Sequence, residues 1–334
     1  EIKVSVFSLS HDANEPIGYV LEKATKKMVL ATDTGYIDKA YFDLLKNADT
    51  AKYRAYDQRT KYVFFDTKMN DVLVEKLNLM NSLKVALDNN EFILYYQPQY
   101  RSSDRKIMGF EALIRWNSPV LGMVSPGRFI PAAEESGAII PLGDWILEEA
   151  IKYIKRIHEL GHNDLIVSIN ISVIQFTQEK FAQKVIELLD KYGLAPKMIE
   201  LEITESIMMD NVETVINNLE IIESAGIPIA LDDFGTGYSS LNYLTKIPIK
   251  TLKIDKSFID TIGSDTEKDT LLDNIIDIGH DLGLSIVAEG VETEDQFLYL
   301  EKMECERIQG YYFSKPVTEE RIHEILEAET TRVI

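Results

Sequence analysis

The stretch Ile229-Ala-Leu-Asp-Asp-Phe-Gly235 decides the fold prediction, because three apolar residues of a short strand are followed at once by two aspartates. The same form, an apolar run with a polar side chain at its end, recurs at Leu252-Lys-Ile-Asp255 and Val287-Ala-Glu289. Amphipathic helical stretches separate these runs, which is typical of a parallel β/α domain. Since the carboxyl ends of parallel strands meet at one edge, we expect the polar side chains to gather there.

Strand-like runs and helical stretches alternate regularly from about residue 91. We expect strands at 92–100, 107–116, 165–172, 198–204, 228–231, 251–254, 284–288 and 307–313. We expect helices at 143–160, 179–192, 212–225, 239–245, 267–282 and 294–301, several of them ended by glycine. Eight strands in about 244 residues fit an α/β fold of the TIM-like (β/α)8 barrel type. The spacing leaves a doubly wound open sheet as the rival.

The chain divides by pattern into three parts. Residues 1–66 predict a small α+β segment, with strands at 3–9, 18–22 and 27–32 and a helix at 37–46. Residues 67–90 carry an apolar stripe at helical spacing and predict a connector helix. Residues 91–334 form the predicted barrel domain.

Composition limits the classes of function. The 334 residues contain 35 Lys and Arg against 55 Asp and Glu, a formal charge of -20, which argues against a DNA-binding role. The single cysteine, Cys305, excludes an internal disulfide and favours a reduced, cytoplasmic compartment. No apolar run is long enough for a membrane span, so we expect no membrane contact. The chain starts at Glu1, which predicts a fragment whose missing segments leave membrane anchoring open.

Oxygen-bearing side chains end one predicted strand after another. Each alone has a simpler interpretation as a turn residue, a helix cap or a solvated side chain. Together, carboxylates and an amide at one edge would repel strongly unless cations bound there, and such ligands suit Mg²⁺ or Mn²⁺. A pair of aspartates favours two ions about 3.5–4 Å apart, which suits phosphoester hydrolysis. The oxygen-bearing residues are Glu111, Asn170, Glu202, Glu205, Asp232, Asp233, Asp255, Glu289 and Gln309, and the cationic Lys253 stands among them.

Other chemistries fit less well. The five histidines show no clustering at strand ends, which disfavours a zinc hydrolase. Asp233-Phe-Gly235 spells a kinase tripeptide, but the other kinase motifs are absent. The loop Gly235-Thr-Gly-Tyr-Ser-Ser240 suits either a phosphate cradle or a conformational role beside the aspartates.

A series of motifs covers residues 84–320, beginning with Tyr95-Tyr-Gln-Pro98 and Phe110-Glu-Ala-Leu-Ile-Arg-Trp116. It continues with Ser168-Ile-Asn170, Glu202-Ile-Thr-Glu205, Asp232-Asp-Phe-Gly-Thr-Gly-Tyr-Ser-Ser240, Lys253-Ile-Asp255, Ala288-Glu-Gly-Val-Glu292 and Gln309-Gly310. In this combination and order the motifs resemble the EAL family of cyclic di-GMP phosphodiesterases. The resemblance implies a metal-dependent barrel enzyme of bacterial signalling that hydrolyses cyclic di-GMP to linear pGpG with two Mg²⁺ or Mn²⁺ ions.

The resemblance also implies roles for individual residues. Glu111, Asn170, Glu202, Asp232 and Asp233 match metal ligands, with Asp232 shared between the two ions. Lys253 matches a lysine that orients or deprotonates the attacking water, Gln309 a water-positioning residue, and Glu289 a further acidic residue near the metals. Arg115 matches an arginine that grips a substrate phosphate, and Leu113 and Gln97 are expected beside the substrate.

The resemblance further implies a homodimer. Glu205 matches a glutamate that braces the loop at 233–240, and in the family this loop links the site to the dimer interface. No motif position departs from the active pattern. The alternatives are a catalytically silent cyclic di-GMP receptor, which would keep its output in Asp232→Asn, and a metal phosphodiesterase with another nucleotide substrate.

The first 66 residues allow two interpretations. Residues 49–66 resemble the end of a GGDEF diguanylate cyclase domain, although the signature itself is absent from the chain. Residues 4–48 resemble part of a metallo-β-lactamase fold, in which His11 and Asp33 would be ligands of an incomplete metal site. The alternative is that the whole segment is a degenerate GGDEF remnant. Neither interpretation gives the segment a catalytic role.

Overall fold

A computed structural model of the chain describes residues 3–8, 17–23, 26–31, 67–209, 212–234, 247–263 and 266–332. The chain separates into two compact units, Glu1–Ser82 and Leu83–Ile334. The connector helix expected at 67–90 is helix α2 (Thr67–Ala86), and the division falls within it. The expected helices at 37–46 and 239–245, residues 49–66, His11 and Asp33 lie outside the described residues.

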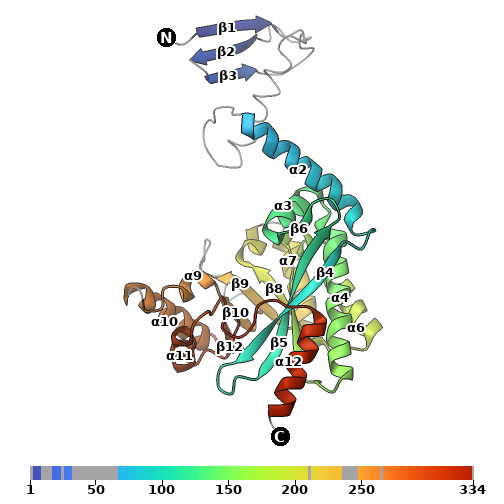
Figure 1. The fold of residues 1–334 in the computed structure, drawn as a ribbon, viewed down its shortest axis with the longest axis vertical. Helices are drawn as coiled ribbons and strands as arrows, with labels where there is room; N and C mark the ends of the chain where they lie inside the picture. The colour runs from blue at the N-terminus through green and yellow to red at the C-terminus, as the bar shows by residue number, and fades with distance from the viewer. Residues whose placement is uncertain are drawn as a thin grey trace. The chain divides into compact units, whose positions relative to one another are not determined.

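In the first unit three strands form an antiparallel sheet in the order β1-β2-β3 (Figure 1). They are β1 (Lys3–Ser8), β2 (Ile17–Lys23) and β3 (Lys26–Ala31), close to the ranges expected from the sequence.

The second unit is built on a closed barrel. Among the described residues eight strands form its ring in the order β4-β12-β11-β10-β9-β8-β7-β5, and β5 pairs back with β4. Closure confirms the TIM-like (β/α)8 barrel and excludes the open sheet. β4 runs antiparallel to both of its neighbours, and the other pairs in the ring are parallel. The strands are β4 (Phe92–Arg101), β5 (Ile107–Ser118), β7 (Ile166–Asn170), β8 (Ile199–Thr204), β9 (Ile229–Phe234), β10 (Thr251–Ile254), β11 (Ser285–Ala288) and β12 (Arg307–Ile308).

Helices lie around this ring, as Figure 1 shows. They are α3 (Pro126–Ser136), α4 (Ile139–Glu159), α5 (Val173–Phe176), α6 (Phe181–Tyr192), α7 (Val212–Ser224), α9 (Lys256–Ile259), α10 (Thr266–Asp281), α11 (Glu294–Lys302) and α12 (Glu319–Arg332), with short turns η1 (Pro196–Met198) and η2 (Glu205–Met209). A further strand, β6 (Gly122–Val124), pairs with the end of β5. The sequence prediction missed α3 and α12 and started α4 four residues late.

The last strand is shorter than expected. The sequence predicts a strand at 307–313, but β12 ends at Ile308 and the chain turns after Gln309. A side chain at Gly310 would place a Cβ only 2.0 Å from the Val291 carbonyl oxygen. Glycine therefore allows the two backbones to approach, and the Gln309 and Val291 backbones are joined by a hydrogen bond of 3.1 Å.

The outward side chains of the strands form the apolar core. On β8, Leu201 and Ile203 alternate with Glu200 and Glu202, and all four are buried. Successive strand residues point to opposite faces, so the apolar ones meet the surrounding helices and the polar ones enter the barrel. Helix α4 packs against β4 and β7 with the buried side chains of Leu147, Ala150, Ile151 and Ile154. Each of the leucine and isoleucine side chains among these stabilises the fold by about 1.5–3 kcal/mol when it is fully buried.

No helix within the described ranges combines the length and apolarity that crossing a membrane requires.

Candidate active site

Polar side chains fill the interior of the barrel in two layers. The upper layer lies toward the carboxyl ends of the parallel strands and comprises Gln97, Glu111, Asn170, Glu202, Asp232, Lys253, Glu289 and Gln309. The lower layer lies beneath it and comprises Gln99, Ser168, Glu200, Thr251 and Arg307. Strand register produces the layers, since Ser168 stands beside Glu200 and Asn170 beside Glu202.

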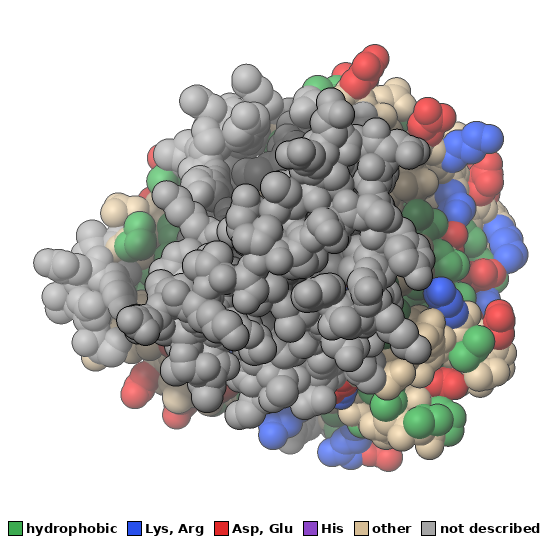
Figure 2. Space-filling view, turned by 90° about the horizontal axis from the view of Figure 1, so that it is seen from above, with side chains coloured by type: hydrophobic (Ala, Val, Ile, Leu, Met, Phe, Trp, Pro, Cys, Tyr) green, Lys and Arg blue, Asp and Glu red, His purple; other side chains and the backbone are tan. Residues whose placement is uncertain are grey.

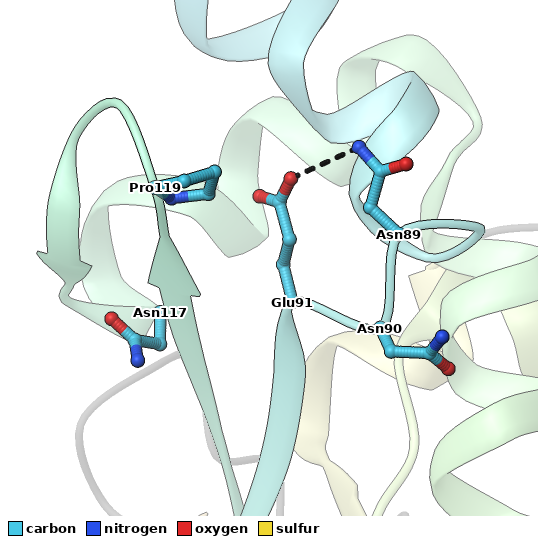
Figure 3. Close-up of a pocket in the computed structure, with 5 residues that line it drawn as sticks. All are labelled: Asn89, Asn90, Glu91, Asn117 and Pro119. Atoms are coloured by element: carbon cyan, nitrogen blue, oxygen red, sulfur yellow. Dashed lines mark hydrogen bonds between the residues drawn. The ribbon is translucent and has the colours of Figure 1, made fainter.

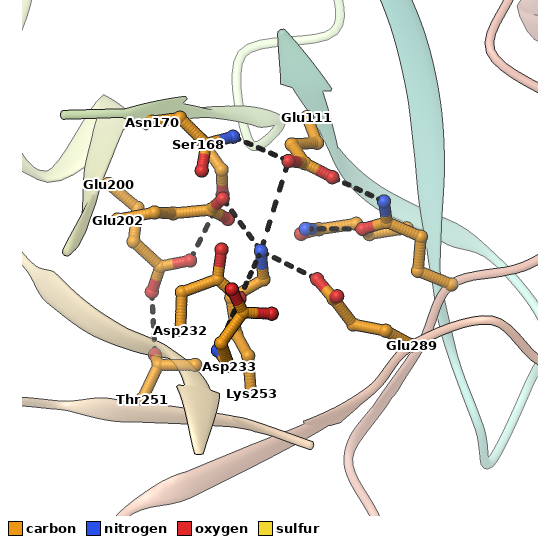
Figure 4. Close-up of polar contacts among 12 residues, drawn as sticks. Glu111, Ser168, Asn170, Glu200, Glu202, Asp232, Asp233, Thr251, Lys253 and Glu289 are labelled. Carbon is orange, nitrogen blue, oxygen red and sulfur yellow. Dashed lines mark hydrogen bonds and ion pairs between the residues drawn. The ribbon is translucent and has the colours of Figure 1, made fainter. Parts of the chain in front are cut away.

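Lys253 is the centre of the upper layer. Its ammonium Nζ lies 2.6 Å from Glu289 Oε1, 2.7 Å from Glu202 Oε2, 3.1 Å from Asp232 Oδ1 and 3.9 Å from Glu111 Oε1. The lysine is 1% exposed. Figure 4 shows these carboxylates, from β5, β8, β9 and the end of β11, directed toward the one ammonium group.

Amide groups hold Glu111 from both sides. Asn170 Nδ2 donates to Glu111 Oε1 over 2.6 Å, and Gln309 Nε2 donates to Glu111 Oε2. Gln309 Nε2 also donates to Gln97 Oε1 over 3.1 Å, and Gln97 Nε2 donates to the Ser314 carbonyl over 3.0 Å. The orientation of Glu111 is therefore fixed by its neighbours.

Burial and neighbouring charges shift the pKa values of the ionisable side chains in the upper layer. Burial raises the pKa of Glu202 well above its usual range, and nearby Glu111 and Asp232 add to the effect. Burial also raises the pKa of Glu289 to about 8, although Lys253 opposes the shift. Burial alone would raise the pKa of Glu111, but Lys253 and the two amide donors lower it. The four carboxylates hold the pKa of Lys253 well above its usual value despite burial, so the lysine stays protonated.

The upper layer carries more negative charge than Lys253 can balance. Glu202 Oε1 is buried and has no hydrogen-bond partner among the residues that the structure describes. A buried carboxylate oxygen without a partner is costly, and a hard cation would satisfy it. The Lys253 ammonium stands between the carboxylates. In the part of the chain that the structure describes, no group of three Asp, Glu, His or Cys side chains is arranged as metal ligands. The donor set nonetheless fits Mg²⁺ or Mn²⁺, because it consists of carboxylate and amide oxygens.

Asp233 follows Asp232 at the end of β9 in a strained conformation. Its φ angle is +55°, a region that side chains other than glycine rarely adopt and that costs about 1 kcal/mol or more. Its backbone N–H donates to Asp232 Oδ1 over 3.0 Å, which orients that carboxylate. Burial and the adjacent Asp232 raise the pKa of Asp233. Strained residues of this kind cluster at functional sites.

Arg115 and Leu113 lie on β5 above Glu111. Alternation along the strand gives Glu111, Leu113 and Arg115 the same face. The Arg115 guanidinium lies 5.4 Å from the centre of the Tyr95 ring, and its Nη1 donates to the Ile114 carbonyl over 2.9 Å. Both side chains are half-buried and remain accessible at the edge of the barrel.

Glu205 is the first residue of η2, directly after β8, and is half-buried. Residues 235–240 of the loop that it is expected to brace lie outside the described residues, as does the adjoining helix. Its role and the dimer contact remain predictions.

These observations can be set beside known proteins. The model of the EAL domain matches residues 80–316. The chain belongs to the EAL-domain family.

Two curated relatives show the extent of the similarity. The bifunctional diguanylate cyclase/cyclic di-GMP phosphodiesterase MucR of Pseudomonas aeruginosa is 38% identical over 281 residues, which is 84% of this chain and 41% of MucR. The signaling protein YkoW of Bacillus subtilis is 41% identical over 285 residues, 85% of this chain and 36% of YkoW. The chain therefore spans only about two-fifths of the length of these relatives.

Solved EAL structures share the fold. The EAL enzyme Bd1971 in its cAMP- and cyclic-di-GMP-bound form superposes with a TM-score of 0.74 at 32% identity, over 96% of this chain and 92% of that one. The PaMucR phosphodiesterase in complex with c-di-GMP gives a TM-score of 0.70 at 37% identity, over 73% of this chain and 99% of that one. The EAL model does not extend to residues 1–79, so the resemblances expected there stay predictions.

Sequence reasoning missed the lower layer of this EAL barrel. Arg307 makes a bidentate ion pair with Glu200 over 2.8 and 2.9 Å, and Thr251 Oγ1 donates to Glu200 over 2.6 Å. Arg307 lowers the pKa of Glu200 against the effect of burial. Ser168 Oγ also donates to Glu200, over 3.1 Å. The alternation of side chains along a strand could have revealed this layer, because residues two positions apart point to the same face. Two positions before a predicted site residue stand Ser168, Glu200, Thr251 and Arg307, and on the antiparallel strand β4 Gln99 stands two positions after Gln97.

A separate pocket of about 460 Å³ contains no residue of either layer. Figure 3 shows Asn89, Asn90, Glu91, Asn117 and Pro119 around it. Glu91 accepts hydrogen bonds there from Trp116 Nε1 over 2.8 Å and from Asn89 Nδ2 over 3.2 Å. Its carboxylate is thus used to hold the end of β5, which gives this pocket a structural explanation.

The outer surface shows no extended basic area in the described part of the face drawn in Figure 2, where acidic and basic side chains are interspersed.

Proposed function

We propose that the chain is a cyclic di-GMP phosphodiesterase that hydrolyses one phosphodiester bond and releases linear pGpG. The observation that carries the proposal is the upper layer, where the carboxylates of the EAL motifs surround one buried lysine at the open end of the barrel. Membership of the EAL family and similarity to a phosphodiesterase bound to c-di-GMP support the substrate.

Two divalent ions, Mg²⁺ or Mn²⁺, complete the proposed site. The ions would be held by Glu111, Asn170, Glu202, Asp232 and Asp233. The buried Glu202 Oε1 accepts no hydrogen bond from the described residues and would be a ligand of one ion. When bound, the ions would supply Lewis acidity that lowers the pKa of water and stabilises negative charge on the phosphate.

Lys253 is proposed to orient the attacking water rather than to deprotonate it. Its pKa is raised by four carboxylates, so it holds its proton and can only donate. Glu289 Oε1 lies 2.6 Å from the Lys253 ammonium, and a carboxylate in this position can accept a proton from a water that Lys253 orients. Glu289 is therefore the residue best suited to accept the proton of the water.

The substrate would lie along β5 at the edge of the barrel. Arg115 is proposed to bind a phosphate, since a guanidinium donates two parallel hydrogen bonds to phosphate oxygens. Leu113 offers an apolar contact on the same strand face. Gln97 accepts a hydrogen bond from Gln309 and donates one to the Ser314 carbonyl. We propose that Gln97 contributes to the site by orienting Gln309.

A homodimer through residues 233–240 and the adjoining helix is part of the proposal, as is a cytoplasmic location. Light scattering with and without cyclic di-GMP tests the dimer. A monomer throughout the micromolar range, in both conditions, would count against it.

Chromatographic product analysis tests the activity. We expect cyclic di-GMP to yield pGpG in Mg²⁺ or Mn²⁺, no product in EDTA, and none from Glu111→Ala. Ser168→Ala is the matched control, because it alters the lower layer alone. Binding of cyclic di-GMP without cleavage by the wild-type chain would replace the enzyme with a receptor, and faster cleavage of a cyclic mononucleotide would replace the substrate.

A further inference from the structure

A chain of hydrogen bonds crosses the barrel from the lower layer to Glu111. Arg307 Nη1 donates to Gln99 Oε1 over 3.3 Å, and Gln99 Nε2 donates to Gln309 Oε1 over 2.9 Å. Gln309 Nε2 then donates to Glu111 Oε2. All four side chains are buried, with exposed fractions of 0–6%. The chain connects the Arg307–Glu200 ion pair with the carboxylate that the EAL motif contributes to the site.

Arg307 sets the orientation of the Gln99 amide. The two ends of a glutamine amide have nearly the same shape, so packing alone leaves either orientation open to Gln99. Gln309 has a second orienting contact, because its Nε2 also donates to Gln97 Oε1 over 3.1 Å, and Arg307 acts on it beside Gln97. A guanidinium has five donors and no acceptor, and it therefore requires the carbonyl oxygen of Gln99. The NH₂ group of Gln99 then faces Gln309, whose carbonyl must turn toward it.

The orientation of Gln309 determines which of its groups faces Glu111. With its carbonyl used by Gln99, Gln309 has only its NH₂ group left for the Glu111 carboxylate, which needs a donor. In the reverse orientation the Gln309 carbonyl would face the carboxylate, and two acceptors would repel each other. Arg307 itself has little freedom, because Glu200 binds it through two parallel hydrogen bonds and its Nη2 donates to Thr251 over 2.7 Å.

We propose that Arg307, acting through Gln99, is a positioning residue that keeps Gln309 as a hydrogen-bond donor to Glu111. The inference rests on the proposed function in one respect, namely that Glu111 is a ligand of a divalent ion. A ligand carboxylate held by fixed donors on both oxygens needs no reorganisation when the ion binds. Partners of this kind commonly contribute about 10–100-fold to metal affinity.

The test compares Gln99→Met with Ser168→Ala in the full chain. Methionine has nearly the length of glutamine, but it forms neither of the two hydrogen bonds that Gln99 contributes to the hydrogen-bond relay from Arg307 to Glu111. Ser168→Ala removes a buried hydrogen bond to Glu200 in the same layer but lies off the route to Glu111. Mn²⁺ affinity is measured by electron paramagnetic resonance, and kcat and KM with cyclic di-GMP are measured alongside.

We expect Gln99→Met to weaken Mn²⁺ binding about tenfold and to lower kcat with little change in KM, and Ser168→Ala to stay within about twofold of wild type. Equal Mn²⁺ affinity in wild type and Gln99→Met would overturn the relay, as would equal weakening by Ser168→Ala. Wild-type chain that binds Mn²⁺ but does not cleave cyclic di-GMP would contradict the proposed function alone. Wild-type chain that binds no Mn²⁺ would overturn both.

If Gln99→Met does not fold, Gln99→Glu carries the test. A carboxylate has the shape of the amide but only accepts, so it would bond Arg307 and also the NH₂ group of Gln309. The Gln309 carbonyl would then face Glu111. The same loss of Mn²⁺ affinity is expected, and unchanged affinity in this variant would overturn the relay.

Discussion

The two polar layers of the barrel differ in charge balance. In the lower layer one arginine faces one glutamate, and Thr251 and Ser168 supply further hydrogen bonds to that glutamate. In the upper layer Lys253 faces four carboxylates, and no described residue forms a hydrogen bond with Glu202 Oε1. A satisfied buried ion pair fixes a structure, whereas excess charge with strongly shifted pKa values is typical of functional sites. The same strands thus carry the structural lower layer and, two residues apart, the layer that we propose as the active site.

The largest expected effect comes from the upper layer. Asp232→Asn removes a carboxylate of the proposed metal site and should lower kcat for cyclic di-GMP by about a thousandfold or more. The unfolding temperature without divalent ions should not fall, since one of several mutually repelling carboxylates is neutralised. Product assays and thermal melts measure both quantities. A large loss of stability with modest loss of activity would make this layer structural.

The opposite pattern is expected in the lower layer. Arg307→Met leaves Glu200 buried without its cation and should lower the free energy of unfolding by about 3–5 kcal/mol. The double variant Arg307→Met with Glu200→Met should recover most of that loss, because apolar side chains can replace a buried pair. Urea unfolding measures the difference. Unchanged stability in the single variant would remove the contrast between the layers.

Arg115 should affect binding more than chemistry. Arg115→Met is expected to raise KM for cyclic di-GMP about tenfold or more with kcat little changed, since a charge-assisted hydrogen bond contributes about 1.5–3 kcal/mol. Arg101→Met is the matched control, because Arg101 pairs with Asp104 in the hairpin after β4. Steady-state kinetics decide the point, and an equal rise in KM for both variants would contradict the assignment.

The upper layer should also respond to pH. Glu289 has a pKa of about 8 in the folded chain and near 4.5 when unfolded, so the folded state holds a proton that the unfolded state has lost between these values. Without divalent ions, stability therefore decreases as pH rises from about 4.5 to about 8. A bound cation would favour the deprotonated carboxylate, so the rise in unfolding temperature caused by Mn²⁺ should be larger at pH 8.5 than at pH 6. An equal or smaller rise at pH 8.5 would contradict this, and Glu289→Gln should reduce the difference.

The smallest effect is expected outside both layers. Glu91→Gln weakens the hydrogen bond from Trp116 beside the pocket at the end of β5 and should cost about 1 kcal/mol or less. Hydrolysis should be unchanged, which a parallel product assay checks. A marked loss of activity would assign that pocket a functional role.

Much of the fold was predictable because the strands of a barrel carry a strict period of two. Ile229-Ala-Leu-Asp-Asp predicted a strand and the polar side chains at its end together. Closure through the pairing of β4 with β5 was not fixed by the spacing of the strands, which also fitted an open sheet. The end of β12 was not predictable, because close approach of Gly310 to Val291 is a tertiary contact. The sequence prediction did not include helices α3 and α12.

The site was predicted by residue type but not by partner. Carboxylates at strand ends were evident as a group, and the resemblance to the EAL family supplied their roles. That Lys253 would lie within 3.1 Å of three of them depends on register between strands far apart in sequence. Arg307 and Glu200 were missed because each was considered as a strand residue, and only the closed ring brings β8 and β12 side chains together.

The count of bound Mn²⁺ ions tests the central claim most directly. Electron paramagnetic resonance titration of the wild-type chain, of Asp233→Asn and of Ser168→Ala separates the two layers in one experiment. We predict two ions in wild type and Ser168→Ala, and one in Asp233→Asn. No binding at millimolar Mn²⁺, or the same count in all three proteins, would contradict the assignment of the upper layer as a two-cation site.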